Sequence, residues 1–314
     1  MTERYAFIRD HRSEYPVVFL CKTLEVSRSG FYDFCKREPS QHSKDDERLS
    51  AKISDLFSDS RETYGARRIV KELDEPCSRH RAARLMRAKK LVPKKRKRWK
   101  WRYRKVERPN VSPNLLRRNF QVSEPNKVWV GDIKYIWTAE GWLYLATVID
   151  LFSRMVVGWS MSAKADAQLV KEALVMAHTE RQPEAELIFH SDQGCQYTSH
   201  SFQDLLKGLG VTGSMSGRGQ CLDNAVAESF FSSLDTELLW GNPLKTRSQG
   251  RVEVFKYIEV FYNRKRRHST LGYVSPLSFE HSHEESKVRS SSPVVIARTR
   301  TGAVTTGERA RTSP

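Results

Sequence analysis

The chain has 314 residues, 39% of them hydrophobic, with seven Trp and fourteen Phe, so it can form one large core and smaller modules. This composition excludes a chain that is disordered over most of its length. No apolar run reaches the roughly 18 to 20 residues of a membrane span, and the charged start lacks the apolar stretch of a signal peptide. Five widely spaced cysteines without a C-x-x-C pair argue against a disulfide framework and a zinc site, and predict a reducing cytoplasm.

The net charge of +17 is concentrated in one segment, because residues 84–108 contain fourteen Lys or Arg and a single acid. Such a segment attracts polyanions and predicts salt-sensitive binding to nucleic acid. Aromatic side chains lie among the charges, and exposed rings can stack on bases. A solvated basic face is the alternative. The side chains that we expect to contact DNA here are Lys94, Lys95, Arg96, Lys97, Arg98, Trp99 and Trp101.

Two helical modules are predicted from the N-terminus onward. Residues 1–40 are expected to form short helices that resemble a helix-turn-helix, though with low specificity. Residues 41–93 are expected to form three short helices, the first beginning at Asp45 and the third capped by Ser78, as in a helix-turn-helix DNA-binding module. A plain helical bundle with a soluble basic face is the alternative. On the third helix, the residues placed to reach a DNA groove are Arg79, Arg81 and Arg84.

The remaining chain changes in pattern. Residues 94–122 are expected to be a basic linker. Three β-rich runs, a helix, a fourth strand, a helix, a fifth strand and two further helices follow, an order typical of an α/β fold with helices covering a sheet. We therefore place a core domain at residues 123–283. Residues 284–314 are rich in Ser, Arg and Thr without periodicity, which predicts a disordered tail.

Three acids of the core domain stand where a carboxylate needs an explanation. Asp132 lies within an apolar strand, where an uncompensated charge is costly. Asp192 follows the fourth strand, and open α/β sheets bind ligands at strand ends. Glu228 lies in the first turns of a helix, between small residues that let the helix approach the sheet. Each acid alone more often caps or pairs, but metal-assisted phosphoryl transfer needs hard oxygen ligands converging on Mg²⁺ or Mn²⁺.

Two polar residues close to these acids in sequence have two interpretations each. His190 orients Asp192 or the substrate, or it is a packed histidine. Asn224 is interpreted as the cap of the helix that bears Glu228, with support of the site from behind the acids as the alternative.

Three charged or ionisable residues are open in the same way. Asp150 assists metal binding or, as we favour, pairs with Arg154. Arg267 and His268 grip phosphate near a scissile bond, or they belong to a solvated helix end.

Four segments in chain order resemble the signatures of one family: WVGDIKYI, HSDQGCQYTS, SMSGRGQCLDNAVAESFF and FYNRKRRHSTLGYVSP. The spacing of the acids adds to them, since Asp132 precedes Asp192 by sixty residues and thirty-five residues separate Asp192 from Glu228. Over residues 45–280 the chain is similar to insertion-sequence transposases with a retroviral-integrase-like core. The resemblance implies an RNase H-like, five-stranded mixed sheet, and it makes Asp132, Asp192 and Glu228 the metal ligands.

The resemblance also implies a reaction and its partners. Such enzymes use Mg²⁺ or Mn²⁺, expected as a pair of ions, to nick DNA at element ends and join the freed 3′-hydroxyl to another phosphodiester. The implied partners are DNA, further copies of the chain, and an upstream-frame protein or a fusion with it, at the nucleoid of a bacterial cytoplasm. The alternatives are a catalytically silent DNA-binding regulator or inhibitor of transposition, and a plain RNase H-type nuclease.

Overall fold

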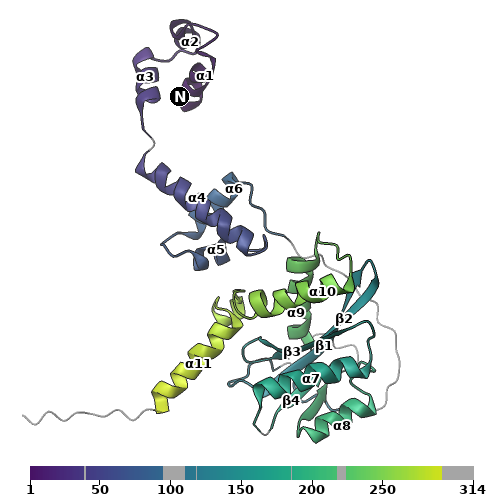
Figure 1. Cartoon of the computed structure of the whole chain (residues 1–314). Helices are drawn as coiled ribbons and strands as arrows, with labels where there is room; N and C mark the ends of the chain where they lie inside the picture. The colour runs from purple at the N-terminus through teal and green to yellow at the C-terminus, as the bar shows by residue number, and fades with distance from the viewer. Residues whose placement is uncertain (39, 95–109, 118, 185, 218–223, 292–314) are drawn as a thin grey trace, which may run out of the picture. The chain divides into compact units, whose positions relative to one another are not determined.

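The computed structural model describes residues 1–38, 40–94, 110–117, 119–184, 186–217 and 224–291. The chain divides into two compact units, Met1–Trp99 and Lys100–Pro314 (Figure 1), and each has its own hydrophobic cores. Within the described ranges, no helix combines the length and the apolar character that crossing a membrane requires.

The first unit begins with three short helices around a small core. They are α1 (Thr2–His11), α2 (Val17–Thr23) and α3 (Arg28–Lys36). The side chain of Ser27 caps α3 by accepting from the backbone N–H of Gly30 at 3.3 Å. The buried side chains that hold the three helices together are Ile8, Leu20, Cys21 and Phe31.

Three further helices of this unit surround a second core (Figure 1). They are α4 (Gln41–Asp59), α5 (Ala66–Glu72) and α6 (Arg79–Ala88). Ser78 caps α6 as predicted, accepting from the N–H of Arg81 at 3.1 Å. The prediction that α4 begins at Asp45 is wrong, because the helix begins four residues earlier, at Gln41. The side chain of Ser40 caps it by accepting from the N–H of Ser43. The core side chains at helical spacing include Leu49, Ile53, Phe57, Ile69 and Leu85.

The second unit is built on a five-stranded mixed sheet, so the predicted fold class is confirmed. The strands are β1 (Val128–Thr138), β2 (Gly141–Asp150), β3 (Val156–Ser162), β4 (Ile188–Ser191) and β5 (Thr212–Met215). Their order in the sheet is β3-β2-β1-β4-β5. The first three strands are antiparallel neighbours, whereas β4 pairs in parallel with both β1 and β5. The parallel pairs place the ends of β1, β4 and β5 at one edge, where α/β sheets bind ligands.

Helices cover both faces of this sheet (Figure 1). One face carries α7 (Ala167–Arg181) and α8 (His200–Gly208). The other carries α9 (Ala225–Leu234), continued by the π-helical turn η2 (Asp235–Leu239), and α10 (Arg247–Phe255), continued by η3 (Lys256–Tyr262). A short turn, η4 (Ser269–Leu271), leads to α11 (Pro276–Ser291).

Strand alternation assigns side chains to these two layers. On β2, Leu145 and Ile149 pack toward α9 and α10, whereas Ala146 and Val148 pack toward α7 and α8. Both faces of the central strands are therefore buried, which accounts for their nearly continuous apolar sequence.

Two predicted boundaries need correction. The described residues of the predicted linker 94–122 include an ordered segment against the sheet: Leu116 is buried and the carbonyl oxygen of Pro113 accepts from the N–H of Met215 at 3.3 Å. The predicted tail begins too early, because α11 continues to Ser291 and Lys287 bonds to Glu124 at 2.9 Å. The prediction of disorder for residues 292–314 falls outside the described residues.

Candidate active site

Parallel pairing of β1 and β4 brings Asp132 and Asp192 to the same edge of the sheet. In this register Val130 of β1 lies opposite His190 of β4. Each acid comes two residues after its paired position, so the two carboxylates leave neighbouring strands at the same level. Gly131 keeps the strands close, since a side chain there would meet the ring of Phe189 at 2.4 Å.

Glu228 approaches the same edge from the helix that covers the sheet. The amide of Asn224, at the start of α9, donates to the carbonyl oxygen of Gly131 at 3.4 Å, next to Asp132. Glu228 follows Asn224 by four residues and therefore shares its face of the helix. The small side chain of Ala227 is fully buried against the sheet, which lets α9 approach closely.

Asn224 stands at the N-cap position of α9, as predicted, but its side chain makes no capping hydrogen bond. Its amide instead ties the helix to β1, and this matches the alternative of a supporting role beside the acids. The neighbouring Asp223 lies outside the described residues.

The electrostatics of Asp132 indicate that the other two carboxylates lie near it. The pKa of Asp132 is raised to about 8, first by burial and then by the charges of Asp192 and Glu228. The N–H of Ile133 donates to the Asp132 carboxylate at 2.7 Å and opposes the rise only in part. Asp192 and Glu228 are themselves exposed at the surface. The structure thus brings together the three acids that the sequence singles out.

One cation beside these acids was not predicted. Lys134 follows Asp132 by two residues, so it lies on the same face of β1, and its positive charge lowers the pKa of Asp132. Its ammonium pairs with Asp235 of η2 at 2.5 Å. The alternation in D-I-K is the only sequence signal that could have identified it.

The carboxylates are not yet gathered into a ligand shell. Among the residues that the structure describes, no three His, Cys, Asp or Glu side chains form a ready-made metal site. The two exposed acids must therefore turn toward Asp132 if the three are to share an ion.

His190 is a packed histidine. It is fully buried, and its ring nitrogens lie 2.9 Å from the hydroxyl of Ser214 and 3.2 Å from that of Ser216. These contacts join the end of β4 to β5 directly beneath Asp192. Its effect on the site is therefore to fix the strand that precedes the acid.

The predicted pairing of Asp150 with Arg154 is wrong. The Asp150 carboxylate accepts from the N–H groups of Asn126 at 2.7 Å and Phe152 at 2.8 Å, and Arg181 lies 3.7 Å away. Burial raises the pKa of Asp150 to about 6, which these hydrogen bonds oppose. The guanidinium of Arg154 turns instead to the carbonyl oxygen of Phe120 at 3.0 Å. Asp150 therefore ties the segment before β1 to the turn that follows β2.

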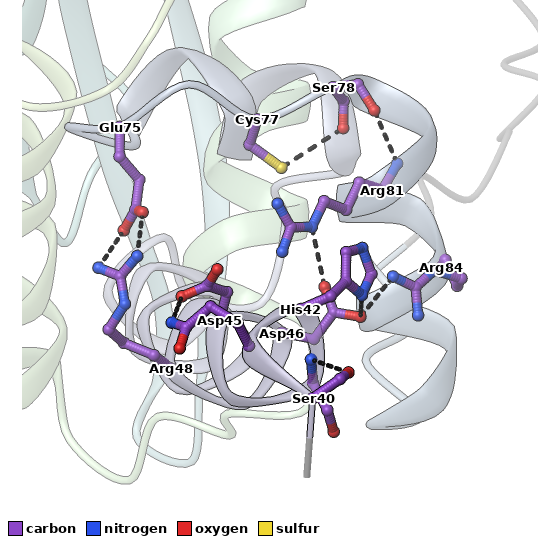
Figure 2. A network of polar contacts seen from close by, with 12 residues as sticks. Ser40, His42, Asp45, Asp46, Arg48, Glu75, Cys77, Ser78, Arg81 and Arg84 are labelled. Carbon is purple, nitrogen blue, oxygen red and sulfur yellow. Dashed lines mark hydrogen bonds and ion pairs between the residues drawn. The ribbon is translucent and has the colours of Figure 1, made fainter.

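The predicted recognition residues lie in a network of ion pairs (Figure 2). Asp46 of α4 accepts from Arg81 at 2.8 Å and from Arg84 at 2.5 Å. These hydrogen bonds, of which that from Arg84 has the largest effect, hold the pKa of Asp46 below its usual value. Arg79 is exposed at the start of α6. Lys94 lies 3.5 Å from Glu62.

The other predicted DNA contacts differ in their placement. Lys95, Arg96, Lys97, Arg98, Trp99 and Trp101 lie outside the described residues. Arg267 is half-buried and donates to the carbonyl oxygen of Tyr273 at 3.1 Å. His268 is buried with its ring edge-on to Tyr262, so it has no open face for a phosphate.

The residue that the sequence analysis missed in this region is Arg266. It is buried and bonds to Glu237 at 2.9 and 3.0 Å and to the hydroxyl of Ser233 on α9 at 2.9 Å. Tyr257 donates to the same Glu237 carboxylate at 2.8 Å. This buried network holds the helix that bears Glu228 in place. The sequence has four consecutive cations at residues 264–267, and nothing in it indicates which one is buried.

Sequence comparisons place both units in known families. Residues 122–221 and 228–283 match models described as integrase core domains, and residues 44–99 match a model described as an HTH-like domain. The chain is 41% identical over 285 residues to the transposase InsF for insertion sequence IS3A of Escherichia coli K12. That alignment covers 89% of this chain and 99% of the relative. It is also 38% identical over 269 residues to an uncharacterized 31 kDa protein of insertion element IS600 from Shigella sonnei, covering 85% and 99%.

Among solved structures, the chain is similar to the HTLV-2 integrase catalytic core domain in complex with magnesium. The two share 18% identity with a TM-score of 0.38, over 50% of this chain and 97% of that one.

Proposed function

Because the chain belongs to the family of the IS3 transposases, we propose that Asp132, Asp192 and Glu228 are its catalytic residues and hold a pair of Mg²⁺ or Mn²⁺ ions. The proposed reaction is hydrolytic nicking at the ends of the element, followed by attack of the freed 3′-hydroxyl on a target phosphodiester. The observation that carries the proposal is that the carboxylates of Asp192 and Glu228 lie close enough to Asp132 for their charges to add to the rise that burial causes in its pKa.

The donor set fits a hard divalent cation. All three groups are carboxylates, and Mg²⁺ and Mn²⁺ prefer oxygen ligands. Crowding like charges around a desolvated carboxylate is costly unless a cation compensates them. Turning the exposed side chains of Asp192, which accepts from the N–H of Gly194 at 2.8 Å, and Glu228 toward Asp132 would complete the ligand set. When bound, the ions would activate the attacking oxygen and stabilise the leaving one.

The neighbouring residues fix where the chemistry occurs. The β1–β4 register and Gly131 hold two of the acids on adjacent strands, and Asn224 holds the helix of the third against β1. Asp132 must release its proton before it can ligate a cation. Lys134 favours the ionised form of Asp132.

Binding of DNA falls to the helical unit and the basic segment. Arg79 is exposed on α6, whereas Arg81 and Arg84 must exchange Asp46 for phosphate when DNA binds. We retain Lys94 and the segment up to Trp101 as proposed phosphate and base contacts. Assembly into an oligomer on DNA, a protein from an upstream frame and location at the nucleoid stay predictions.

The test is a cleavage and strand-transfer assay on duplexes that carry the ends of the element encoding the chain. Asp192→Asn and Glu228→Gln should each reduce Mg²⁺-dependent product on the order of 10³-fold or more, since several kcal/mol of transition-state stabilisation depend on the ions. Binding of the same duplex should be unchanged. Asp204→Asn, at an exposed position on α8, is the matched control and should retain full activity.

The alternatives make different forecasts in this assay. A catalytically silent regulator would bind the ends without producing cleaved DNA in any variant, with or without an upstream-frame partner. A plain nuclease would cleave without joining strands. Undiminished strand transfer by Asp192→Asn would remove the catalytic assignment.

A further inference from the structure

Four aromatic side chains line one face of the β1–β2 hairpin: Tyr135, Trp137, Trp142 and Tyr144, here called the aromatic ladder. Tyr135 pairs across the strands with Tyr144, and Trp137 with Trp142. The ring centroids lie 4.9 Å apart in both pairs, and Tyr135 and Trp142 connect them diagonally at 6.2 Å. The four rings therefore form one continuous surface.

This surface is open to solvent. Tyr135 is 50%, Trp137 62% and Trp142 44% exposed. By strand alternation the rings belong to the sheet face of α7 and α8, as do Ile133 and Ala146, but the hairpin runs past the buried part of that face. Single exposed apolar residues are ordinary, whereas a contiguous set of large rings marks an interaction site.

The ladder begins near Asp192, one of the proposed catalytic acids. In the described part of the chain, β1 pairs with β4 only over Val128–Val130, and beyond Gly131 its neighbour in the sheet is β2, apart from an isolated bridge between Thr138 and Leu244. Tyr135 follows Asp132 by three residues, ~10 Å along the strand, and by alternation its ring lies on the opposite face of β1 from the Asp132 carboxylate. Burial and the nearby Tyr144 raise the pKa of the Tyr135 phenol, and the charges of Cys195 and Asp192 add to the rise. The first ring thus lies next to the loop that carries Asp192.

We propose that the aromatic ladder binds unpaired nucleotides of the DNA substrate by base stacking, next to the phosphodiester that the carboxylates cleave or join. The proposal deepens the proposed function, on which its choice of DNA rests. Where the strand that enters the acids is separated from its partner, its unpaired bases can stack on Trp and Tyr with little regard to sequence.

The arrangement of the rings suits this occupant. Neighbouring rings meet edge to face, with interplanar angles of 64° to 85°. In such a pair, the ring that offers its edge keeps both of its faces clear of its partner, so a base can lie against it. At the hairpin turn the guanidinium of Arg247 donates to the carbonyl oxygen of Trp142 at 3.0 Å. That cation offsets the adjacent Glu140, whose carboxylate accepts from the N–H of Arg247.

A second copy of the chain is the competing occupant, since Tyr and Trp are also enriched at protein interfaces. Proximity to Asp192 favours nucleotides, because the charge of this acid reaches the phenol of Tyr135 at the start of the ladder. The two occupants separate by experiment.

The experiment measures binding of a fluorescent oligothymidine to the full chain without divalent metal. The variants are Trp137→Ala, Trp142→Ala and their combination, with Trp137→Phe as the conservative change. Phe255→Ala, at a ring 47% exposed on α10, is the matched control. Loss of one stacking ring should weaken binding roughly 5- to 150-fold. The factor should be the same at low and high salt, because stacking involves no phosphate charge, and Trp137→Phe should keep most of the affinity.

Each outcome decides the proposal. Weaker oligothymidine binding by the Ala variants, with binding of blunt duplex and circular dichroism unchanged, supports the ladder. Equal oligothymidine binding by wild type and the double variant overturns it, and a concurrent loss of oligomers in that variant would assign the face to a second copy. Failure of the cleavage assay would end the proposed function while leaving oligothymidine binding intact, so the two failures are distinguishable.

Discussion

Carboxylates of the two units have opposite electrostatic environments. In the helical unit, Asp46 meets Arg84 and Arg81, and Glu75 meets Lys52 and Arg48, so the pKa of each acid is lowered. In the sheet unit, Asp132 meets two further acids and loses solvent, so its pKa rises to about 8. The first arrangement is complete without a ligand. We propose that a cation completes the second, which would be the physical difference between an acid that holds a structure and one that serves a catalytic site.

Within the sheet unit, a buried ion pair contrasts with the exposed acids that we propose for catalysis. Arg266 and Glu237 are both buried and bonded to each other, in contrast to the exposed acids at Asp192 and Glu228. Burial therefore ranks the ion pairs by their expected effect on stability. Losing one partner of a buried pair is costly, whereas surface pairs in the helical unit contribute little.

The largest effect on stability should come from Arg266→Met. This change leaves the buried Glu237 carboxylate without its cation and should lower the free energy of unfolding by about 3–5 kcal/mol. Denaturant unfolding of the full chain measures it. Arg48→Met, which removes a cation from a surface pair with Glu75, is the matched control and should leave the midpoint nearly unchanged. Equal effects of the two changes would contradict the ranking by burial. Adding Glu237→Gln to Arg266→Met removes the unpaired carboxylate and should restore part of the lost stability.

A second effect on stability should appear in the pH dependence of the metal-free chain. The folded pKa of Asp132, about 8, exceeds the value of about 4 that an unburied aspartate has. Between those values the folded state keeps a proton that the unfolded state releases, so stability falls as pH rises from about 4 to about 8. Asp132→Asn cannot titrate. The thermal midpoint of wild type should therefore drop relative to that of Asp132→Asn over this window and level off above it.

A constant difference between the two midpoints across the window would contradict the crowding of the acids. Asp204→Asn serves again as the control, because its exposed carboxylate should follow wild type at every pH.

The smallest effect should come from Asp46→Asn. This change releases Arg81 and Arg84 from their shared carboxylate, so both become available to phosphate (Figure 2). Affinity for duplex DNA should rise several-fold at low salt, and the dependence of log affinity on log salt should steepen by up to about two units. Stability should hardly change, since surface pairs contribute little. Unaltered affinity and slope would remove α6 from the DNA interface.

The order of strands and helices was predictable because period and turn residues mark each element. The positions of Asp132 within β1 and of Asp192 after β4 were predictable for the same reason, since one interrupts an apolar strand and the other follows one. The sequence also implies that Ser78 caps α6, as observed.

The sequence could not predict which residue a given charged or polar side chain contacts. Asp150 was assigned to Arg154, four residues away, but chain folding brings Arg181 to it instead. Arg266 could not be distinguished from its neighbours, because its partner Glu237 lies twenty-nine residues away in the chain and the cluster of cations does not mark which one turns inward. Asn224 was read locally as a cap, although its partner lies on β1, ninety-three residues away in the chain.

Titration of Mn²⁺ into the full chain by calorimetry tests the convergence of the three carboxylates most directly. Wild type should bind about two ions per chain, with release of protons below pH 8 as Asp132 ionises. Asp132→Asn, Asp192→Asn and Glu228→Gln should each weaken binding, and the triple variant should show none. Binding of Mn²⁺ by the triple variant with the stoichiometry and affinity of wild type would contradict the account.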